Sequence, residues 1–131
     1  MAPRSLPDEL RQFFQDYASA FESFDGNRIA SFYHAPCLTM RADGSIHCLQ
    51  TQEDVRRFFQ NVANTYHAEG YRSGRLLDFE VVPIGARSAL ATMSWETLRE
   101  DGTVVRRWRQ SYNTARVGGQ WRILVSTIHL A

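Results

Sequence analysis

The sequence predicts an α+β protein in which most helices precede an antiparallel sheet. In the first half, apolar residues recur at spacings of three and four, the period of an amphipathic helix. In the second half, runs with alternating side chains are separated by short turn motifs, the pattern of β-hairpins. The 131 residues are 44% hydrophobic and 22% charged, which fits a single globular domain spanning residues 1–131.

The first helix is expected to begin at Pro7, because proline suits a first helical turn. Asp8 and Glu9 follow, and acidic side chains complement the positive end of a helix dipole. Asp25-Gly26 is expected to end this helix. Its apolar stripe comprises Leu10, Phe13, Phe14, Tyr17, Phe21 and Phe24.

Two further helices are expected in the first half. A short one should stop before Pro36, since the residue preceding a proline disfavours helical geometry. It would direct Ile29, Phe32 and Tyr33 inward. A third helix should begin after Thr51, which forms a capping-box pattern with Asp54, and should end at Gly70. Its apolar stripe comprises Val55, Phe58, Phe59, Val62 and Tyr66.

A β-hairpin is expected over residues 37–41 and 46–50, around the turn Asp43-Gly44. This turn predicts the pairs Thr39–Cys48 and Cys37–Gln50. Both cysteines would then share a face with Arg41, whereas His47 would point the other way.

The histidines and cysteines near this hairpin do not form a convincing metal site. A structural zinc site needs four converging ligands, and at most His34, Cys37 and Cys48 approach one another. We therefore expect no metal and no cofactor. A nucleophilic Cys37 would need an activating base or cation, for which His34 and Arg41 are the candidates. In the structural alternative, Cys37 is a small buried residue beside a corner that Pro36 and His34 fix.

Four more strands are expected over residues 75–83, 88–99, 103–116 and 121–130. Their register follows from two-residue turns at 101–102 and 118–119. The first turn predicts the pairs Trp95–Trp108, Met93–Gln110 and Ala91–Tyr112. The second turn predicts the pairs Tyr112–Val125, Gln110–Thr127 and Trp108–His129.

Alternation then assigns the side chains of these strands to two faces. One face is aromatic with a few polar groups, and it should meet the helices. It comprises Ala91, Met93, Trp95, Trp108, Gln110, Tyr112, Thr114, Ile123, Val125, Thr127 and His129. The other face is largely polar and includes Glu96 opposite Arg107 as a cross-strand ion pair. Leu124 and Ile128 also lie on this outer face and need partial cover.

Charge and hydropathy argue against two classes of partner. The net charge is +1, and the only basic run, residues 106–109, alternates between the two sheet faces, so we expect no nucleic-acid binding. No apolar stretch approaches the roughly 20 residues of a membrane-spanning helix. The N-terminal residues lack the apolar core of a signal peptide, so the expected location is the cytoplasm, with both cysteines reduced.

The order of these elements resembles the NTF2-like superfamily, the cone-shaped α+β fold of SnoaL-like cyclases, ketosteroid isomerase and scytalone dehydratase. The segments that carry the resemblance are YASAFESFDGNRIASFYHAPC and GGQWRILVSTIHL, the second resembling a G-x-W-x-I ending. The chain looks closest to uncharacterised bacterial members with a Tyr-His-x-Pro-Cys segment. The resemblance implies a curved antiparallel sheet wrapped around three helices, a pocket at the wide end of the cone, and a homodimer through the outer sheet face.

The resemblance also places individual residues in the pocket. Tyr17 matches the tyrosine of ketosteroid isomerase that donates to the substrate oxygen. The general-base aspartate falls on Arg41, and the second acid falls on Ser111 or Tyr112, with strand parity favouring Tyr112. Because the isomerase needs two carboxyl groups with separated pKa values and an arginine stays protonated, steroid isomerisation is not expected. The SnoaL-type aspartate also falls near Tyr112, so that acid–base chemistry is not expected either.

Three hypotheses for function follow. The leading one is a binding protein for an apolar, aromatic or polycyclic ligand that carries a carbonyl or hydroxyl group. Its expected ligand-binding residues are Met93, Trp95, Trp108, Gln110, Thr127, Arg41 and Cys37. The second hypothesis is a cofactor-free lyase or isomerase of the SnoaL or dehydratase kind, in which Tyr17, Tyr112 and His129 are the acid–base groups. The third is an association module whose pocket is filled by its own side chains.

Overall fold

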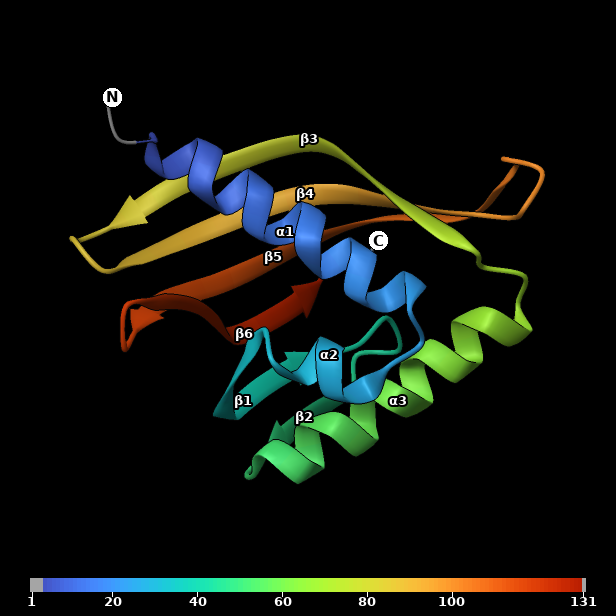
Figure 1. Cartoon of the computed structure of the whole chain (residues 1–131), viewed down its shortest axis with the longest axis horizontal. Helices are drawn as coiled ribbons and strands as arrows, with labels where there is room; N and C mark the ends of the chain where they lie inside the picture. The colour runs from blue at the N-terminus through green and yellow to red at the C-terminus, as the bar shows by residue number, and fades with distance from the viewer. Residues whose placement is uncertain (1–3, 131) are drawn as a thin grey trace.

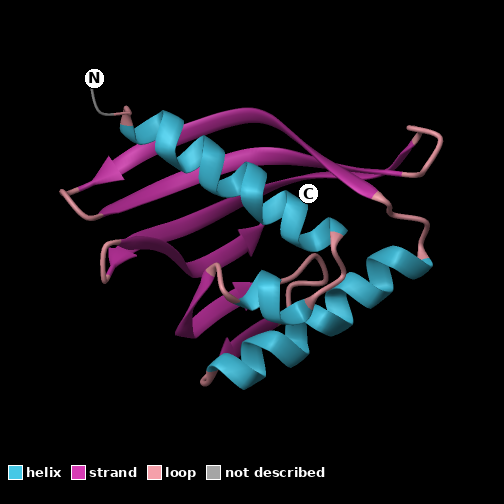
Figure 2. Ribbon diagram, viewed as in Figure 1, coloured by secondary structure: helices cyan, strands magenta, loops and turns pink. Residues whose placement is uncertain are grey.

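Three helices and one six-stranded sheet make up residues 4–130, the part of the chain that the computed structural model describes (Figure 1). The elements are α1 (Leu6–Glu22), α2 (Gly26–Ala30), β1 (Tyr33–Met40), β2 (Ile46–Leu49), α3 (Gln52–Ala68), β3 (Ser73–Ile84), β4 (Ser88–Leu98), β5 (Val104–Val117) and β6 (Gln120–Ile128). The strand order is β2-β1-β6-β5-β4-β3. The sheet is curved and the helices lie on its concave side (Figure 2), which confirms the predicted α+β fold.

The two long helices begin at capping residues that the sequence provides. The Ser5 side chain accepts a hydrogen bond from the backbone N–H of Asp8, so α1 begins at Leu6, one residue before the expected Pro7. Thr51 and Asp54 form the predicted capping box at the start of α3. These bonds satisfy N–H groups that have no partner inside the helix.

The short helix α2 ends earlier than the sequence indicated. It stops at Ala30, and residues 33–36 belong to β1 instead. The reason is pairing across the sheet: Tyr33 lies opposite Ile123, whose N–H donates to the carbonyl of Phe32 over 2.8 Å. Pro36 lies where the register between β1 and β6 is irregular, a position that tolerates a residue without an N–H.

The β4–β5 hairpin has the predicted register over most of its length. Trp95 pairs with Trp108, Met93 with Gln110, and Ala91 with Tyr112. The turn itself is longer than expected. The backbone N–H of Arg99 donates to the carbonyl of Thr103, which leaves three residues in the loop between them. A compensating irregularity between Thr97 and Leu98 restores the register.

The β5–β6 register is correct only near its turn. Val117 pairs with Gln120 and Thr114 with Ile123, as predicted, but a bulge then shifts the pairing by one residue, so that Tyr112 pairs with Ser126. An extra residue in one strand reverses which side chains face inward. Ser126 and Ile128 are therefore buried, and the predictions that Val125, Thr127 and His129 face inward and that Ile128 faces outward are wrong.

The β1–β2 hairpin also differs from the expected register by one residue. The loop has three residues, because Arg41 N–H donates to the carbonyl of Ser45, and the observed pairs are Cys37–Leu49, Leu38–Cys48 and Thr39–His47. Cys37 is buried and Cys48 is exposed, so the two cysteines do not share a face. The parallel pairing of β1 with β6 is a further departure from the purely antiparallel sheet that we expected.

The core lies between the concave face of the sheet and the helices. Its largest fully buried side chains include Tyr33, Tyr112, Phe14 and Phe59, which come from β1, β5, α1 and α3. Aromatic rings thus join the elements that surround the interior of the cone. Within residues 4–130, no helix has the length and apolar character that crossing a membrane requires.

Candidate functional site

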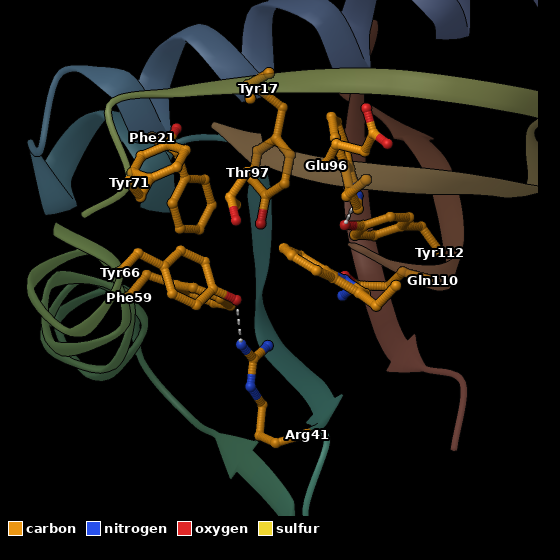
Figure 3. A pocket seen from close by; sticks show the side chains of 14 residues that line it. Tyr17, Phe21, Arg41, Phe59, Tyr66, Tyr71, Glu96, Thr97, Gln110 and Tyr112 are labelled. Atoms are coloured by element: carbon orange, nitrogen blue, oxygen red, sulfur yellow. Dashed lines mark hydrogen bonds between the residues drawn. The ribbon is translucent and has the colours of Figure 1, made fainter. Parts of the chain in front are cut away.

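A cavity of about 50 Å³ lies inside the cone, between helices α1 and α3 and the inner sheet face (Figure 3). Most of its wall is aromatic, and the few charged and amide side chains come from β4, β5 and the loop after β1. The lining residues are Tyr17, Ala18, Phe21, Arg41, Phe59, Tyr66, Tyr71, Gly74, Trp95, Glu96, Thr97, Trp108, Gln110 and Tyr112.

The structure brings together six of the ten site residues that the sequence indicated. These are Tyr17, Arg41, Trp95, Trp108, Gln110 and Tyr112. Met93 and Cys37 are buried in the core and do not line the cavity. Thr127 and His129 lie on the other side of the sheet, and the ring of His129 bonds through Nε2 to the hydroxyl of Ser111 over 2.8 Å.

Several lining residues were not proposed from the sequence. Phe21, Phe59 and Tyr66 lie on the predicted apolar stripes of the helices, so the stripes themselves were the signal. Thr97 has the same strand parity as Trp95 and could have been assigned to the inner face in the same way. Tyr71 lies in the irregular segment between α3 and β3, where no periodic pattern indicates the direction of a side chain.

Tyr17 of α1 and Tyr33 of β1 form a buried pair of phenols. Their hydroxyl oxygens are 2.6 Å apart. Burial, more than any neighbouring charge, raises the pKa of Tyr17 well above the usual value for tyrosine, and burial also raises the pKa of Tyr33. Both phenols therefore stay protonated at neutral pH, and such a group donates a hydrogen bond but does not act as a base.

Tyr112 is held in a similar environment on β5. The indole Nε1 of Trp95 donates to its hydroxyl over 2.8 Å. That bond favours the ionised phenol, but burial is the larger effect and raises the pKa of Tyr112 well above its usual value. Tyr112 is thus also a neutral hydroxyl at physiological pH.

Gln110 presents an amide to the cavity. Its side chain is buried, and its Oε1 accepts a hydrogen bond from Nε1 of Trp108 over 2.8 Å. With the oxygen directed at Trp108, the two N–H groups on Nε2 have no acceptor among the described residues. A primary amide thus offers its donors to whatever occupies the open space.

Arg41 follows β1 and directs its guanidinium group toward the cavity (Figure 3). Its two terminal nitrogens donate to Thr39 Oγ1 and to the hydroxyl of Tyr66, each over 3.3 Å. The guanidinium carbon lies 5.7 Å from the centre of the Phe58 ring. Among residues 4–130, no carboxylate forms an ion pair with Arg41.

Glu96 lines part of the cavity wall, but its carboxylate is engaged elsewhere. Arg75 donates to it over 2.6 Å, and a nitrogen of Arg107 is 3.6 Å from it. The predicted cross-strand pair of Glu96 with Arg107 is therefore confirmed. Because these arginines lie on the outer sheet face, Glu96 supplies no acid or base to the interior.

The structure does not bring the cysteines and histidines of residues 4–130 together as a metal-binding cluster. Within the described part of the chain, no cluster of three or more histidine, cysteine, aspartate or glutamate side chains is placed to hold a metal ion. Burial raises the pKa of the Cys37 thiol to about 11, so this cysteine is not a thiolate at neutral pH. His34 bonds through Nδ1 to the carbonyl of Pro36 over 3.0 Å, in the corner position that the sequence suggested.

Comparison with solved structures shows the same fold in proteins of very different sequence. Aln2 from a Streptomyces species superposes with a TM-score of 0.79 at 16% identity, over 98% of this chain and 93% of that one. An NTF2-like protein of unknown function from Shewanella oneidensis has a TM-score of 0.74 at 11% identity, over 95% and 98%. An NTF2-like protein with a cystatin-like fold from Novosphingobium aromaticivorans has a TM-score of 0.74 at 15% identity, over 92% and 79%. At these identities the similarity establishes the fold alone.

Sequence comparison identifies the family. No curated protein matches the chain. The model of the family DUF6841, described as NTF2-like protein, matches residues 8–131, which is nearly the whole sequence. The cone, the curved sheet and this match agree with the resemblance inferred from the sequence, and the chain belongs to the NTF2-like family DUF6841.

Proposed function

We propose that the protein binds a small organic molecule with one ring in the cavity of the cone. The observation that carries this proposal is the amide of Gln110, whose N–H groups have no acceptor among the described residues although the side chain is only 4% exposed. Because Gln110 lines the cavity, these N–H groups are accessible from the open space, and a ligand oxygen could accept a hydrogen bond from them. The aromatic wall would bury the rest of the ligand.

The size of the cavity favours a single ring over the polycyclic compound that the resemblance suggested. The open space of about 50 Å³ is well below the roughly 300–1,000 Å³ of common ligand pockets. Arg41, Tyr66 and Trp108 are partly exposed and line this space. We propose that the ligand enters past these side chains and that they move outward enough to enlarge the space while still lining it.

The lyase or isomerase hypothesis has less support, because the described residues that line the cavity present no free base to it. Tyr17 and Tyr112 stay protonated at neutral pH. His129, the third acid–base group of that hypothesis, lies on the outer face. Binding without chemistry is therefore the function that the arrangement of the described residues supports best.

The test is the variant Trp108→Ala. We expect it to bind no single-ring aromatic compound that the unaltered protein binds, because it removes the partly exposed ring that would cover the ligand. Binding is measured by the shift of amide resonances during titration with a panel of such compounds. The matched control is Trp121→Phe, since Trp121 lies in a separate cluster with Leu10 and Ala89 and should leave binding intact. Equal affinity of Trp108→Ala and unaltered protein would disprove the proposed site.

We further propose that the outer sheet face forms a homodimer. Val82, Leu90, Val125 and Leu38 lie in one row across neighbouring strands, with Asn113 between Leu90 and Val125. Val82 is 57% exposed, Leu38 40% and Leu90 36%. An exposed, mostly apolar row of this kind gains stability when a second copy covers it. Ile128, which was expected to contribute, faces inward.

Light scattering tests the dimer. We expect two chains per particle at micromolar concentration, and we expect the double variant Leu38→Lys/Leu90→Lys to be monomeric, because the new charges would have to be buried between the copies. Val104→Lys is the control, since Val104 is also an exposed apolar residue, at the first position of β5 and away from the row. A monomer in the unaltered protein would contradict the proposal.

A further inference from the structure

The cavity contains a cation whose charge no described residue neutralises. Several arginines of the sheet pair with carboxylates, as Arg75 and Arg107 do with Glu96 and as Arg109 does with Glu80 over 3.3 Å. Arg41 differs, because its partners are the neutral hydroxyls of Thr39 and Tyr66, both at the long end of the hydrogen-bond range. We infer that the ligand of the cavity is an anion, a monocarboxylate with a single ring, whose carboxylate binds Arg41; this inference rests on the proposed function.

The hydrogen-bonding groups around the open space favour an acceptor. A guanidinium group has five N–H donors and no acceptor, and the two bonds that Arg41 makes leave other donors available. Gln110 contributes N–H groups that are free of described partners. The hydroxyl of Tyr71, which also lines the cavity, bonds to no described residue. A carboxylate only accepts hydrogen bonds, so it matches this set of groups better than an amide, an alcohol or an amine does.

The surroundings of Arg41 would strengthen its pairing with an anion. The ring of Phe58 lies beside the guanidinium group and the hydroxyl of Tyr66 bonds to it, so water screens its charge less than it would on an open surface. The flat guanidinium group also binds both oxygens of a carboxylate at once, which fixes the orientation of the ligand. The carboxylate of Glu96 does not compete, because Arg75 and Arg107 hold it on the outer face.

Three compounds separate the contributions of charge and ring. Benzoate has both, benzamide has the ring without the charge, and acetate has the charge without the ring. In calorimetric titrations of the full chain, we expect benzoate to bind with a dissociation constant of about 1 mM or lower, and at least about ten-fold more tightly than either other compound. Benzamide binding as tightly as benzoate, or acetate doing so, would overturn the inference.

The role of Arg41 is tested with matched variants. Arg41→Gln should weaken benzoate binding by about ten- to a hundred-fold and leave benzamide binding nearly unchanged, because it removes one charge-assisted pair. Arg41→Lys should restore part of the loss, since it keeps the charge and loses the two-point contact. Arg28→Gln is the control: Arg28 is exposed on α2, and the change alters net charge equally without touching the cavity. Unchanged preference for benzoate in Arg41→Gln would contradict the assignment.

The outcomes distinguish this inference from the proposed function. Equal binding of benzoate and benzamide that is lost in Trp108→Ala would uphold the cavity as a binding site and reject the anion. Absence of binding by benzoate at concentrations of about 10 mM would reject the single-ring carboxylate, while the wider panel tested on Trp108→Ala would still decide whether the cavity binds ligands. Circular dichroism of each arginine variant shows whether a loss of binding comes from unfolding.

Discussion

Replacing Phe14 with alanine is expected to lower the free energy of unfolding by about 3–5 kcal/mol. Phe14 is fully buried, and its ring centre lies 4.7 Å from that of Tyr112 and 5.0 Å from that of Phe13. It therefore joins α1 to the inner face of β5, and its removal leaves a cavity at a contact between two layers. Denaturation in urea, followed by circular dichroism, measures the change.

Trp108→Ala is the comparison for this prediction. Trp108 is larger than Phe14, but it is partly exposed and lines a space that is already open. We expect its removal to cost no more than about 2 kcal/mol, because the neighbouring atoms lose fewer contacts. A loss as large as that of Phe14→Ala would show that the interior near Trp108 is packed, and it would argue for the association module with a filled pocket.

Replacing Gly26 with alanine is expected to destabilise the protein by about 1–3 kcal/mol. Alanine normally stabilises a helix relative to glycine by up to about 1 kcal/mol, so the expected sign is the reverse of the usual one. The added Cβ would lie 2.8 Å from Oε1 of Gln60 and 2.9 Å from the backbone oxygen of Arg56. It would also disturb the hydrogen bonds that Gln60 makes to Gly26 N–H and to the carbonyl of Phe24, which join α2 to α3.

A double-mutant cycle checks this explanation. Gln60→Ala removes one of the two clashing groups, so the double variant Gly26→Ala/Gln60→Ala should lose less stability than the sum of the single variants. The exposed neighbour Asn27 is the control, since Asn27→Ala adds no atom to the α2–α3 contact. Strict additivity, or stabilisation by Gly26→Ala, would show that the two helices separate without cost.

The sequence predicted the helices and most strands well, because their signals are periodic and local. The bulge in β6 had no such signal. Ile123, Leu124 and Val125 are all apolar, so alternation is absent at that point and either register buries an acceptable side chain. The loop after Arg41 likewise contains a glycine that suits loops of two or three residues, and only the structure distinguishes them.

The contrast between local periodic signals and a bulge without one also explains which of the predicted site residues line the cavity. Trp95, Trp108, Gln110 and Tyr112 lie on β4 and β5, in the part of the sheet where the turn-derived register is correct. Thr127 and His129 lie beyond the bulge, where a shift by one residue moves every side chain to the opposite face. Arg41 was assigned to the pocket by the family resemblance, and it lines the cavity, but the absence of a described carboxylate beside it required the structure.

The position of β6 has a consequence for the order in which the protein is built. β6 is synthesised after the other five strands, yet it lies between β1 and β5 and bonds to both. Contacts between residues so far apart in sequence close a large loop and slow folding. During translation, β1 with Arg41 has no partner on that side, and β5 with Gln110 has an open edge, which is the kind of surface that pairs with other chains. The two groups that we assign to the ligand are thus brought into one cavity only when the last strand is inserted between them.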